Sequence, residues 1–172
     1  MKNKIKKETK EKINKKIIIT RIILIVLILI WVFLVYSLSN QSGTESSGIS
    51  RKVAELLFNT EEMIIKAEPI IRKIAHFSEY SVGGVLFYSL FSTYDFSKKK
   101  RTLISLGLGI WYAALDEVHQ LFIPGRSGCI TDVCIDSLGI LFGIIFIRVI
   151  FKILEIIKNK FNRKKAPKDK NG

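Results

Sequence analysis

Carboxylates and histidines that could do chemistry are concentrated in one stretch of the chain, residues 113–136. Asp116 and Gln120 are four residues apart, so a helix would place them on one face with His119 beside them. Asp132 and Asp136, also four apart, follow a short turn that contains proline and glycine. We therefore expect two helices to meet at this turn and to bring their carboxylates to the same end.

A second group of polar residues precedes this stretch. Arg72, His76, Glu79 and Gly83 follow one another at helical spacing and share one helix face. Gly83 and Gly84 lack side chains, which would let another helix approach closely. This segment is therefore a third source of polar side chains for the same site.

Acid–base catalysis is one chemistry that suits these residue types. A carboxylic acid and an imidazole can serve as general acid and general base. Carboxylates that lie close together also raise one another's pKa. The candidate catalytic residues are His76, Glu79, Asp116, Glu117 and His119.

A bound divalent metal is the second chemistry, since carboxylates and imidazoles can hold an ion that activates water or polarises a phosphoryl oxygen. The candidate ligands are His119, Asp132 and Asp136, although their spacing alone is not a metal signature. The guanidinium of Arg126 is planar and can clamp a phosphate or carboxylate with two hydrogen bonds. The candidate substrate-binding residues are Arg72, Gln120 and Arg126.

A polar network that only locks the helices together is the structural interpretation of the same residues. For any single residue this is the simpler explanation. For the whole set we favour function, because a charge at the centre of a bilayer costs about 2.5–3.5 kcal/mol. An apolar interface would hold the helices with fewer penalties.

Long apolar segments must position these residues. Residues 17–36 contain a single charge, Arg21, and their length spans a bilayer core of about 30 Å at about 1.5 Å per residue. The run is long for a signal peptide and no A-x-A cleavage site follows it, so we expect an uncleaved transmembrane helix. Further apolar helices are expected over residues 69–94, 102–120 and 132–151.

The first connection, residues 37–68, is polar. Residues 51–58 have helical spacing of apolar side chains and predict a short helix at the membrane interface. Glu61 and Glu62 suit the first turn of a second short helix. Pro69 suits the first position of the long helix that follows.

Basic residues decide the topology. Of 28 Lys and Arg, eight lie in residues 1–16, four in 98–101 and eight in 152–172, separated by apolar runs. Cytoplasmic segments of membrane proteins carry an excess of Lys and Arg. Four spans with both termini inside place all three basic blocks on the cytoplasmic side. No folded soluble surface is evident for a nucleic-acid patch, although the formal charge is +13. Cys129 and Cys134 are expected to be small apolar side chains and not a disulfide or metal pair.

The polar residues of the different helices are expected at the same depth in the membrane. Counted from the inner end of each helix, Glu79, Asp116, His119 and Asp136 lie about 20–24 Å up at about 1.5 Å per residue. That level is just below the outer surface of the bilayer core. We expect an all-α integral membrane four-helix bundle with short interfacial helices in the first outer loop. Residues 1–16 would be a disordered basic cytoplasmic tail, and residues 152–172 a basic cytoplasmic tail that is helical at first, around a membrane domain of residues 17–151.

Two motifs resemble those of VanZ-like bacterial membrane proteins. The sequence RKIAHFSEY, residues 72–80, is followed by two glycines, and ALDEVHQLFIPGRSGCITDVCIDSLG spans residues 114–139. A third segment, SNQSG at residues 39–43, is similar to one that follows the first span in that family. The resemblance covers roughly residues 17–151.

The resemblance implies an all-helical protein of the bacterial cell membrane that is linked to the cell envelope. The family's founding member lowers susceptibility to the glycopeptide teicoplanin, so antibiotic resistance is one expected role. The partners expected are the lipid bilayer and a cell-wall or lipid-linked envelope component, with no nucleic acid.

Three functions compete. The first is an outer-leaflet site that binds or alters a surface component of the envelope. The second is a membrane-embedded hydrolase or transferase, with or without a divalent metal, that acts on a lipid-linked or phosphorylated substrate. The third is a non-catalytic scaffold or a small transporter, and a four-span transporter would need to form oligomers.

Overall fold

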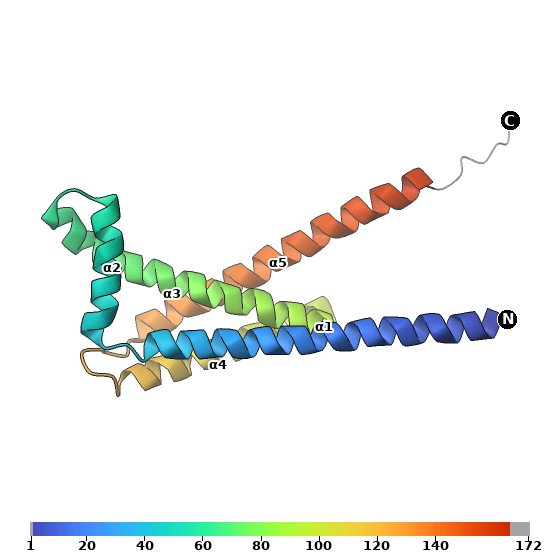
Figure 1. Cartoon of the computed structure of the whole chain (residues 1–172), viewed down its shortest axis with the longest axis horizontal. Helices are drawn as coiled ribbons and strands as arrows, with labels where there is room; N and C mark the ends of the chain where they lie inside the picture. The colour runs from blue at the N-terminus through green and yellow to red at the C-terminus, as the bar shows by residue number, and fades with distance from the viewer. Residues whose placement is uncertain (1, 166–172) are drawn as a thin grey trace.

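Five helices make up the chain in this computed structural model, which describes the backbone of residues 2–165 and the side chains of residue 11 and residues 13–163. Helices α1, α3 and α4 run alongside one another, α5 crosses α3 at an angle and leads away from α1, and a short helix, α2, lies across one end (Figure 1). The all-α prediction is confirmed, with one short helix where two were expected. The elements are α1 (Lys2–Ser39), α2 (Gly43–Leu57), α3 (Glu61–Ser92), α4 (Lys98–Gln120) and α5 (Ile130–Lys165).

Helix α1 contains the most apolar segment. Within the described residues, Ile13–Ser39 is the one stretch long and apolar enough to cross a membrane by length and composition. Its apolar side chains are largely exposed, as Leu29 at 62% and Phe33 at 66% illustrate. The prediction of a long apolar helix over residues 17–36 is therefore confirmed.

The basic N-terminal segment differs from expectation, because we predicted residues 1–16 to be disordered and the helix begins at Lys2. Extending an existing helix is far easier than nucleating one, since each further residue adds a hydrogen bond. Lys and Glu also have good helix propensity, and Lys15 pairs with Glu11 one turn earlier at 3.9 Å.

Helix α2 begins eight residues before the short helix predicted at residues 51–58. Ser42 forms a capping box with Glu45: the Glu45 backbone N–H donates to the Ser42 hydroxyl, and the Glu45 carboxylate accepts from the Ser42 backbone N–H at 2.8 Å. The Ser42 hydroxyl also donates to the Glu45 carboxylate at 2.8 Å, and this bond, with the one from the Ser42 backbone N–H, lowers the pKa of Glu45. A capping box satisfies two unpaired donors and so fixes where a helix begins.

Helix α3 corrects the position assigned to Pro69. We expected a short helix near Glu61 and a separate long helix beginning at Pro69, but one helix runs from Glu61 to Ser92 with the proline inside it. Proline removes one backbone hydrogen bond from a helix interior. Ile64 and Ala67 are buried against Ala54 of α2, and this packing holds the first turns of α3 in line with the rest.

Helices α3 and α5 form the closest pair in the bundle. Gly84 of α3 lies against the backbone of Ile140, and Gly139 and Gly143 of α5 lie against the carbonyl groups of Phe77 and Ser81. A Cβ atom on any of the three glycines would overlap these backbone atoms. The small residues therefore allow the two backbones to touch, as the sequence predicted for Gly84.

Aromatic packing attaches α1 to α3 and α4. Trp31 is 5% exposed, its ring lies 5.9 Å from that of Tyr80 and 5.1 Å from that of Tyr112, and its indole N–H donates to the Glu79 carbonyl at 2.8 Å. The indole also occupies the space beside Gly83. Three helices are thereby fixed in rotation just inside the end of the bundle that carries α2.

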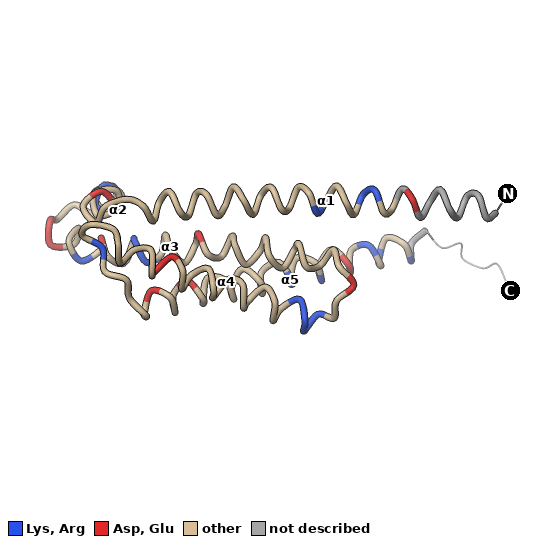
Figure 2. The backbone as a smooth tube through the Cα atoms, turned by 90° about the horizontal axis from the view of Figure 1, so that it is seen from below, with Lys and Arg blue, Asp and Glu red and all other residues tan. Residues whose placement is uncertain are grey.

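Charged residues gather at the two ends. Lys and Arg positions in the described first half of α1, at the start of α4 and in the last turns of α5 lie toward one end, and Asp and Glu positions are frequent at the other (Figure 2). Arg21 closes the basic end by donating to the hydroxyl and carbonyl of Thr93 at 3.0 and 2.8 Å. The predicted polar stretch lies at the opposite end, under α2.

Candidate functional site

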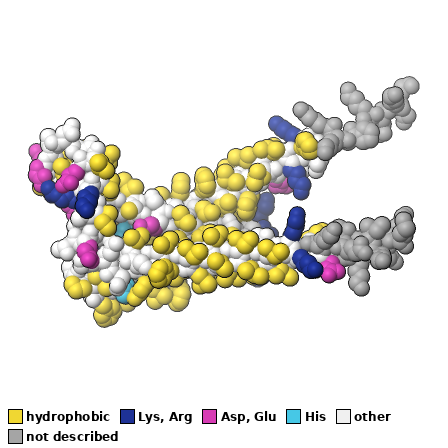
Figure 3. Space-filling view, in the orientation of Figure 1, with side chains coloured by type: hydrophobic (Ala, Val, Ile, Leu, Met, Phe, Trp, Pro, Cys, Tyr) yellow, Lys and Arg dark blue, Asp and Glu magenta, His cyan; other side chains and the backbone are white. Residues whose placement is uncertain are grey.

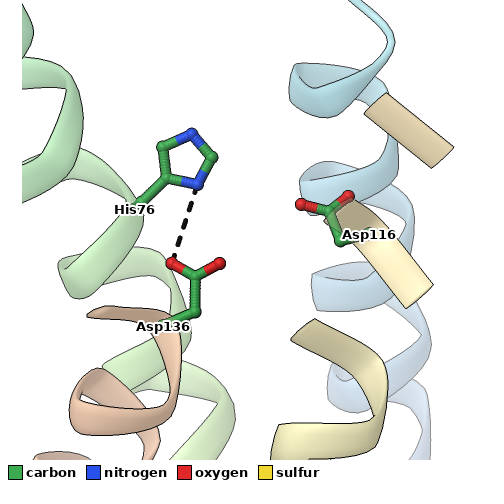
Figure 4. Close-up of side chains that lie close together, drawn as sticks. All are labelled: His76, Asp116 and Asp136. Atoms are coloured by element: carbon green, nitrogen blue, oxygen red, sulfur yellow. Dashed lines mark ion pairs between the residues drawn. The ribbon is translucent and has the colours of Figure 1, made fainter. Parts of the chain in front are cut away.

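Three helices bring one side chain each to the α2 end of the bundle. His76 comes from α3, Asp116 from α4 and Asp136 from α5, and one potential ligand atom of each lies within 4.8 Å of the other two (Figure 4). The close contact between α3 and α5 places His76 opposite Asp136, because Gly139 lies one turn after Asp136 and against α3. We call these three residues the triad.

Burial sets the triad apart from surface charges. Asp136 is fully buried and Asp116 is 6% exposed. Neither Asp136 oxygen, nor His76 Nδ1, has a hydrogen-bond partner among the residues described. The closest approach, from His76 Nδ1 to Asp136 Oδ1, is 3.7 Å and too long for a hydrogen bond. A buried carboxylate without a partner is destabilising, so this arrangement is not explained by helix packing.

Asp116 is held by a chain of hydrogen bonds. The Gln120 amide donates to Asp116 Oδ2 at 3.0 Å, and Arg126 donates to Gln120 Oε1 at 3.3 Å. The i, i+4 pairing of Asp116 and Gln120 is the one predicted from the sequence. The amide fixes one carboxylate oxygen and leaves the other available to a ligand.

Besides its hydrogen bond to Gln120, Arg126 connects two segments of the backbone. Its guanidinium donates to the carbonyls of Gln41 and Leu38 at 3.1 and 3.2 Å, which fastens the end of α1 to the turn before α5. Gly125 adopts a φ of 73° in that turn, and Gly43 lies against its carbonyl. The predicted clamp for a substrate therefore has its donors engaged within the protein.

Two cavities adjoin the triad, with volumes of about 80 and 120 Å³. His76, Arg72 and Arg126 line both. Glu79 and Asp116 line the first, and Asp136 lines the second. A water molecule occupies roughly 30 Å³ of liquid, so each cavity has room for more than one.

Arg72 and Glu79 are the predicted site residues that keep free side chains. Within the described part of the chain, neither the Arg72 guanidinium nor the Glu79 carboxylate has a hydrogen bond or ion pair. Arg72 faces both cavities, which makes it the available cation beside the triad.

The remaining predicted residues lie outside the triad. Glu117 accepts from the Cys129 backbone N–H at 2.8 Å and so anchors the segment before α5. His119 packs its ring 5.1 Å from that of Tyr36. Asp132 is paired with Lys73 at 2.8 Å at the rim of the second cavity. Of the three predicted metal ligands, only Asp136 thus belongs to the cluster.

Sequence reasoning missed two residues near the site. Lys73 neutralises Asp132, and Tyr80 is fully buried one helical turn after His76. Both lie within the first motif, and the spacing of Tyr80 from His76 is the signal that could have indicated it.

A known family model matches most of the chain. Residues 23–152 match the model described as VanZ/LLP1. No curated protein and no solved structure matches the chain.

Proposed function

Because the chain belongs to the VanZ/LLP1 family, we propose that it is a four-span protein of the bacterial cell membrane whose triad acts on an envelope component at the outer leaflet. One helix passes the length and composition test for a membrane span. The other three spans are α3, α4 and the first part of α5.

Exposed apolar side chains support the three further spans. Trp111 of α4 is 62% exposed, and Leu138, Phe142 and Phe146 of α5 are more than half exposed. Hydrophobic atoms cover the visible middle of the molecule between its charged ends (Figure 3). Water would disfavour so large an apolar surface, whereas lipid tails would cover it.

The charge distribution supports the orientation. The start of α1, the start of α4 and the end of α5 carry basic blocks and lie at one end (Figure 2). Basic residues are retained on the cytoplasmic side of membrane proteins. Both termini are then cytoplasmic, and the triad lies toward the outer face under α2.

One observation carries the functional part of the proposal: two buried aspartates and a histidine converge from three helices without neutralising one another. Apolar residues would hold these helices at lower free energy. The arrangement suits a site that handles a ligand, with a carboxylate and an imidazole available as acid and base. Arg72, free beside both cavities, favours a ligand that carries phosphate or carboxylate.

A susceptibility assay tests this proposal. A bacterial strain without other members of the family carries the wild-type chain, Asp116→Asn or Glu62→Gln on a plasmid. Glu62 forms an exposed pair with Lys66, so Glu62→Gln is the matched control. We expect the wild type and the control to change teicoplanin susceptibility or envelope-lipid composition, and Asp116→Asn to lose the change at equal membrane abundance. Full function of Asp116→Asn would contradict the proposal.

A membrane-embedded hydrolase or transferase is the second candidate. The observation in its favour is the 120 Å³ cavity, which places the free Arg72 on the same wall as His76 and Asp136. Release of phosphate from a lipid-linked substrate by purified protein, absent in Asp116→Asn, would separate this enzyme from a binding protein.

A further inference from the structure

We infer that His76, Asp116 and Asp136 bind a divalent first-row transition metal, of the Mn²⁺ to Zn²⁺ class. This inference concerns the site of the proposed function but does not depend on the envelope activity. It follows from the separation, burial and charge of the three side chains and from the residues around them.

Distance is the first argument. Zn²⁺ lies about 2.0–2.2 Å from nitrogen and oxygen ligands, so two ligands on one tetrahedral ion are about 3.4 Å apart. The His76 Nδ1 to Asp136 Oδ1 distance of 3.7 Å is close to this value and outside hydrogen-bond range. A spread of at most 4.8 Å over all three ligand atoms requires only a small closure around an ion.

Unsatisfied groups are the second argument. Asp136 is fully buried, and both its oxygens lack partners within the described chain, as does His76 Nδ1. Figure 4 shows His76 and Asp136 facing each other from α3 and α5. A metal ion bound to His76 Nδ1 and to one oxygen of Asp136 would give both buried groups a partner.

Charge is the third argument. No Lys or Arg in the described residues forms an ion pair with Asp116 or Asp136. Arg126 uses its donors on two carbonyls and Gln120, and Lys73 is paired with Asp132. A dication with two aspartates and a neutral histidine has no net charge, which suits a buried site.

The surrounding residues form a second layer of the kind that orients metal ligands. Gln120 holds one oxygen of Asp116, and Arg126 holds Gln120. Such outer contacts fix the ligand geometry and typically contribute about 10–100-fold in metal affinity.

The donor set indicates the class of metal. One imidazole favours Zn²⁺ or Fe²⁺ over Mg²⁺ and Ca²⁺, and two carboxylates extend the range to Mn²⁺. Three protein ligands leave a coordination position open, which is typical of catalytic sites and not of closed structural ones. That position would face the cavity beside Asp136, where Arg72 could pair with a bound phosphate.

The test uses the full chain purified in detergent. Metal content is measured by mass spectrometry, then the metal is removed with a chelator and Zn²⁺ and Mn²⁺ are titrated back by calorimetry. We expect about one ion per chain. Asp136→Asn should bind at least about 100-fold more weakly, and Gln120→Leu about 10–100-fold more weakly.

Three further variants make the outcome decisive. His76→Gln repeats the ligand test if Asp136→Asn does not fold, with folding checked by gel filtration. A variant with both Cys129→Ser and Cys134→Ser removes the two exposed thiols as adventitious ligands and should retain full binding. Asp132→Asn should also retain it, because Asp132 is paired with Lys73 and lies outside the triad.

Absence of metal and of binding heat in the folded wild type would overturn the inference, as would unchanged affinity in both Asp136→Asn and His76→Gln. These results are independent of the susceptibility assay. A metal-free protein that still alters susceptibility would therefore contradict the metal site without contradicting the proposed function.

Discussion

At the scale of single residues, the unpaired carboxylate of Asp136 links stability to ligand binding. A packing network would satisfy its buried groups, but neither oxygen of Asp136 has a partner in the described structure. The residue therefore lowers the stability of the fold, and on the metal proposal a bound ion would offset that cost.

Asp136→Asn should make the chelator-treated protein more stable, by roughly 1–3 kcal/mol, because an amide needs neither desolvation of a charge nor uptake of a proton on burial. The measurement is thermal unfolding in detergent, with and without added Zn²⁺. Metal should stabilise the wild type, by about 2.7 kcal/mol at a hundred times its dissociation constant, and should leave the variant unchanged. A less stable metal-free variant would support the packing network instead.

The two arginines of the site have different tasks, although the sequence assigned both to substrate binding. Arg126→Gln should lower the stability by about 2–4 kcal/mol, because it removes charged donors to the end of α1 and to Gln120. Arg72→Gln is the matched control and should leave the stability unchanged within about 0.5 kcal/mol, since Arg72 has no partner in the described chain. Denaturant or thermal unfolding measures both, and equal losses would contradict this division.

Spacing predicted part of the triad and not the rest. The shared face of Arg72, His76 and Glu79 was readable, as was the pairing of Asp116 with Gln120. The direction of the His119 side chain could not be predicted. Residues three and four apart are both near neighbours on a helix, so spacing does not decide whether His119 shares the face of Asp116. Contacts distant in sequence fix the rotation of α4, for example Gly109 against Ile140. That rotation turns His119 toward Tyr36.

At the scale of helices, glycines on α3 and α5 set the distance between His76 and Asp136. Gly139→Ala should destabilise the fold, because its Cβ would overlap the Phe77 carbonyl of α3 and backbone cannot move aside as a side chain can. The variant should also weaken metal binding, since the helices must separate. Thermal unfolding and calorimetry measure the two effects.

Gly107→Ala is the control for this prediction. Nothing lies within 4 Å of a Cβ at Gly107, so alanine should be neutral or stabilise α4 by about 0.5–1 kcal/mol through its higher helix propensity. Equal effects of the two alanines would mean that the α3–α5 contact does not set the geometry of the site.

The helix ends that were predicted wrongly from the sequence are those that depend on packing against other helices. Pro69 is a favourable first residue, and only the packing of Ile64 and Ala67 on Ala54 explains why α3 begins earlier. The apolar run of α1, by contrast, is long enough to be predicted from hydropathy alone.

At the scale of the whole molecule, the order of charged and apolar segments predicted more than any single site residue. Three basic blocks separated by apolar runs indicated which helix ends lie together, and the described parts of those blocks lie at one end (Figure 2). The crossing of α2 over the other end was not readable, because it depends on the Gly43–Gly125 contact and on Arg126.

The two cysteines allow a direct test of the orientation. Both are free and exposed, Cys129 before α5 and Cys134 on the apolar surface of α5. With Cys134 replaced by serine, a membrane-impermeant maleimide should label Cys129 from outside intact protoplasts. The hydroxyl of Thr131 lies 3.0 Å from Cys129 Sγ and lowers its pKa, which favours the reactive thiolate.

A reporter on the opposite end completes this test. Asn159→Cys, introduced without the natural cysteines, places a thiol on the exposed basic end of α5. This introduced thiol should be labelled in inverted vesicles and not in protoplasts, because a four-span chain keeps that end cytoplasmic. Labelling of Cys129 and of the introduced thiol from the same side would require α5 not to cross the membrane. The triad would then lie at the cytoplasmic face, and an outer-leaflet substrate would no longer have access to it.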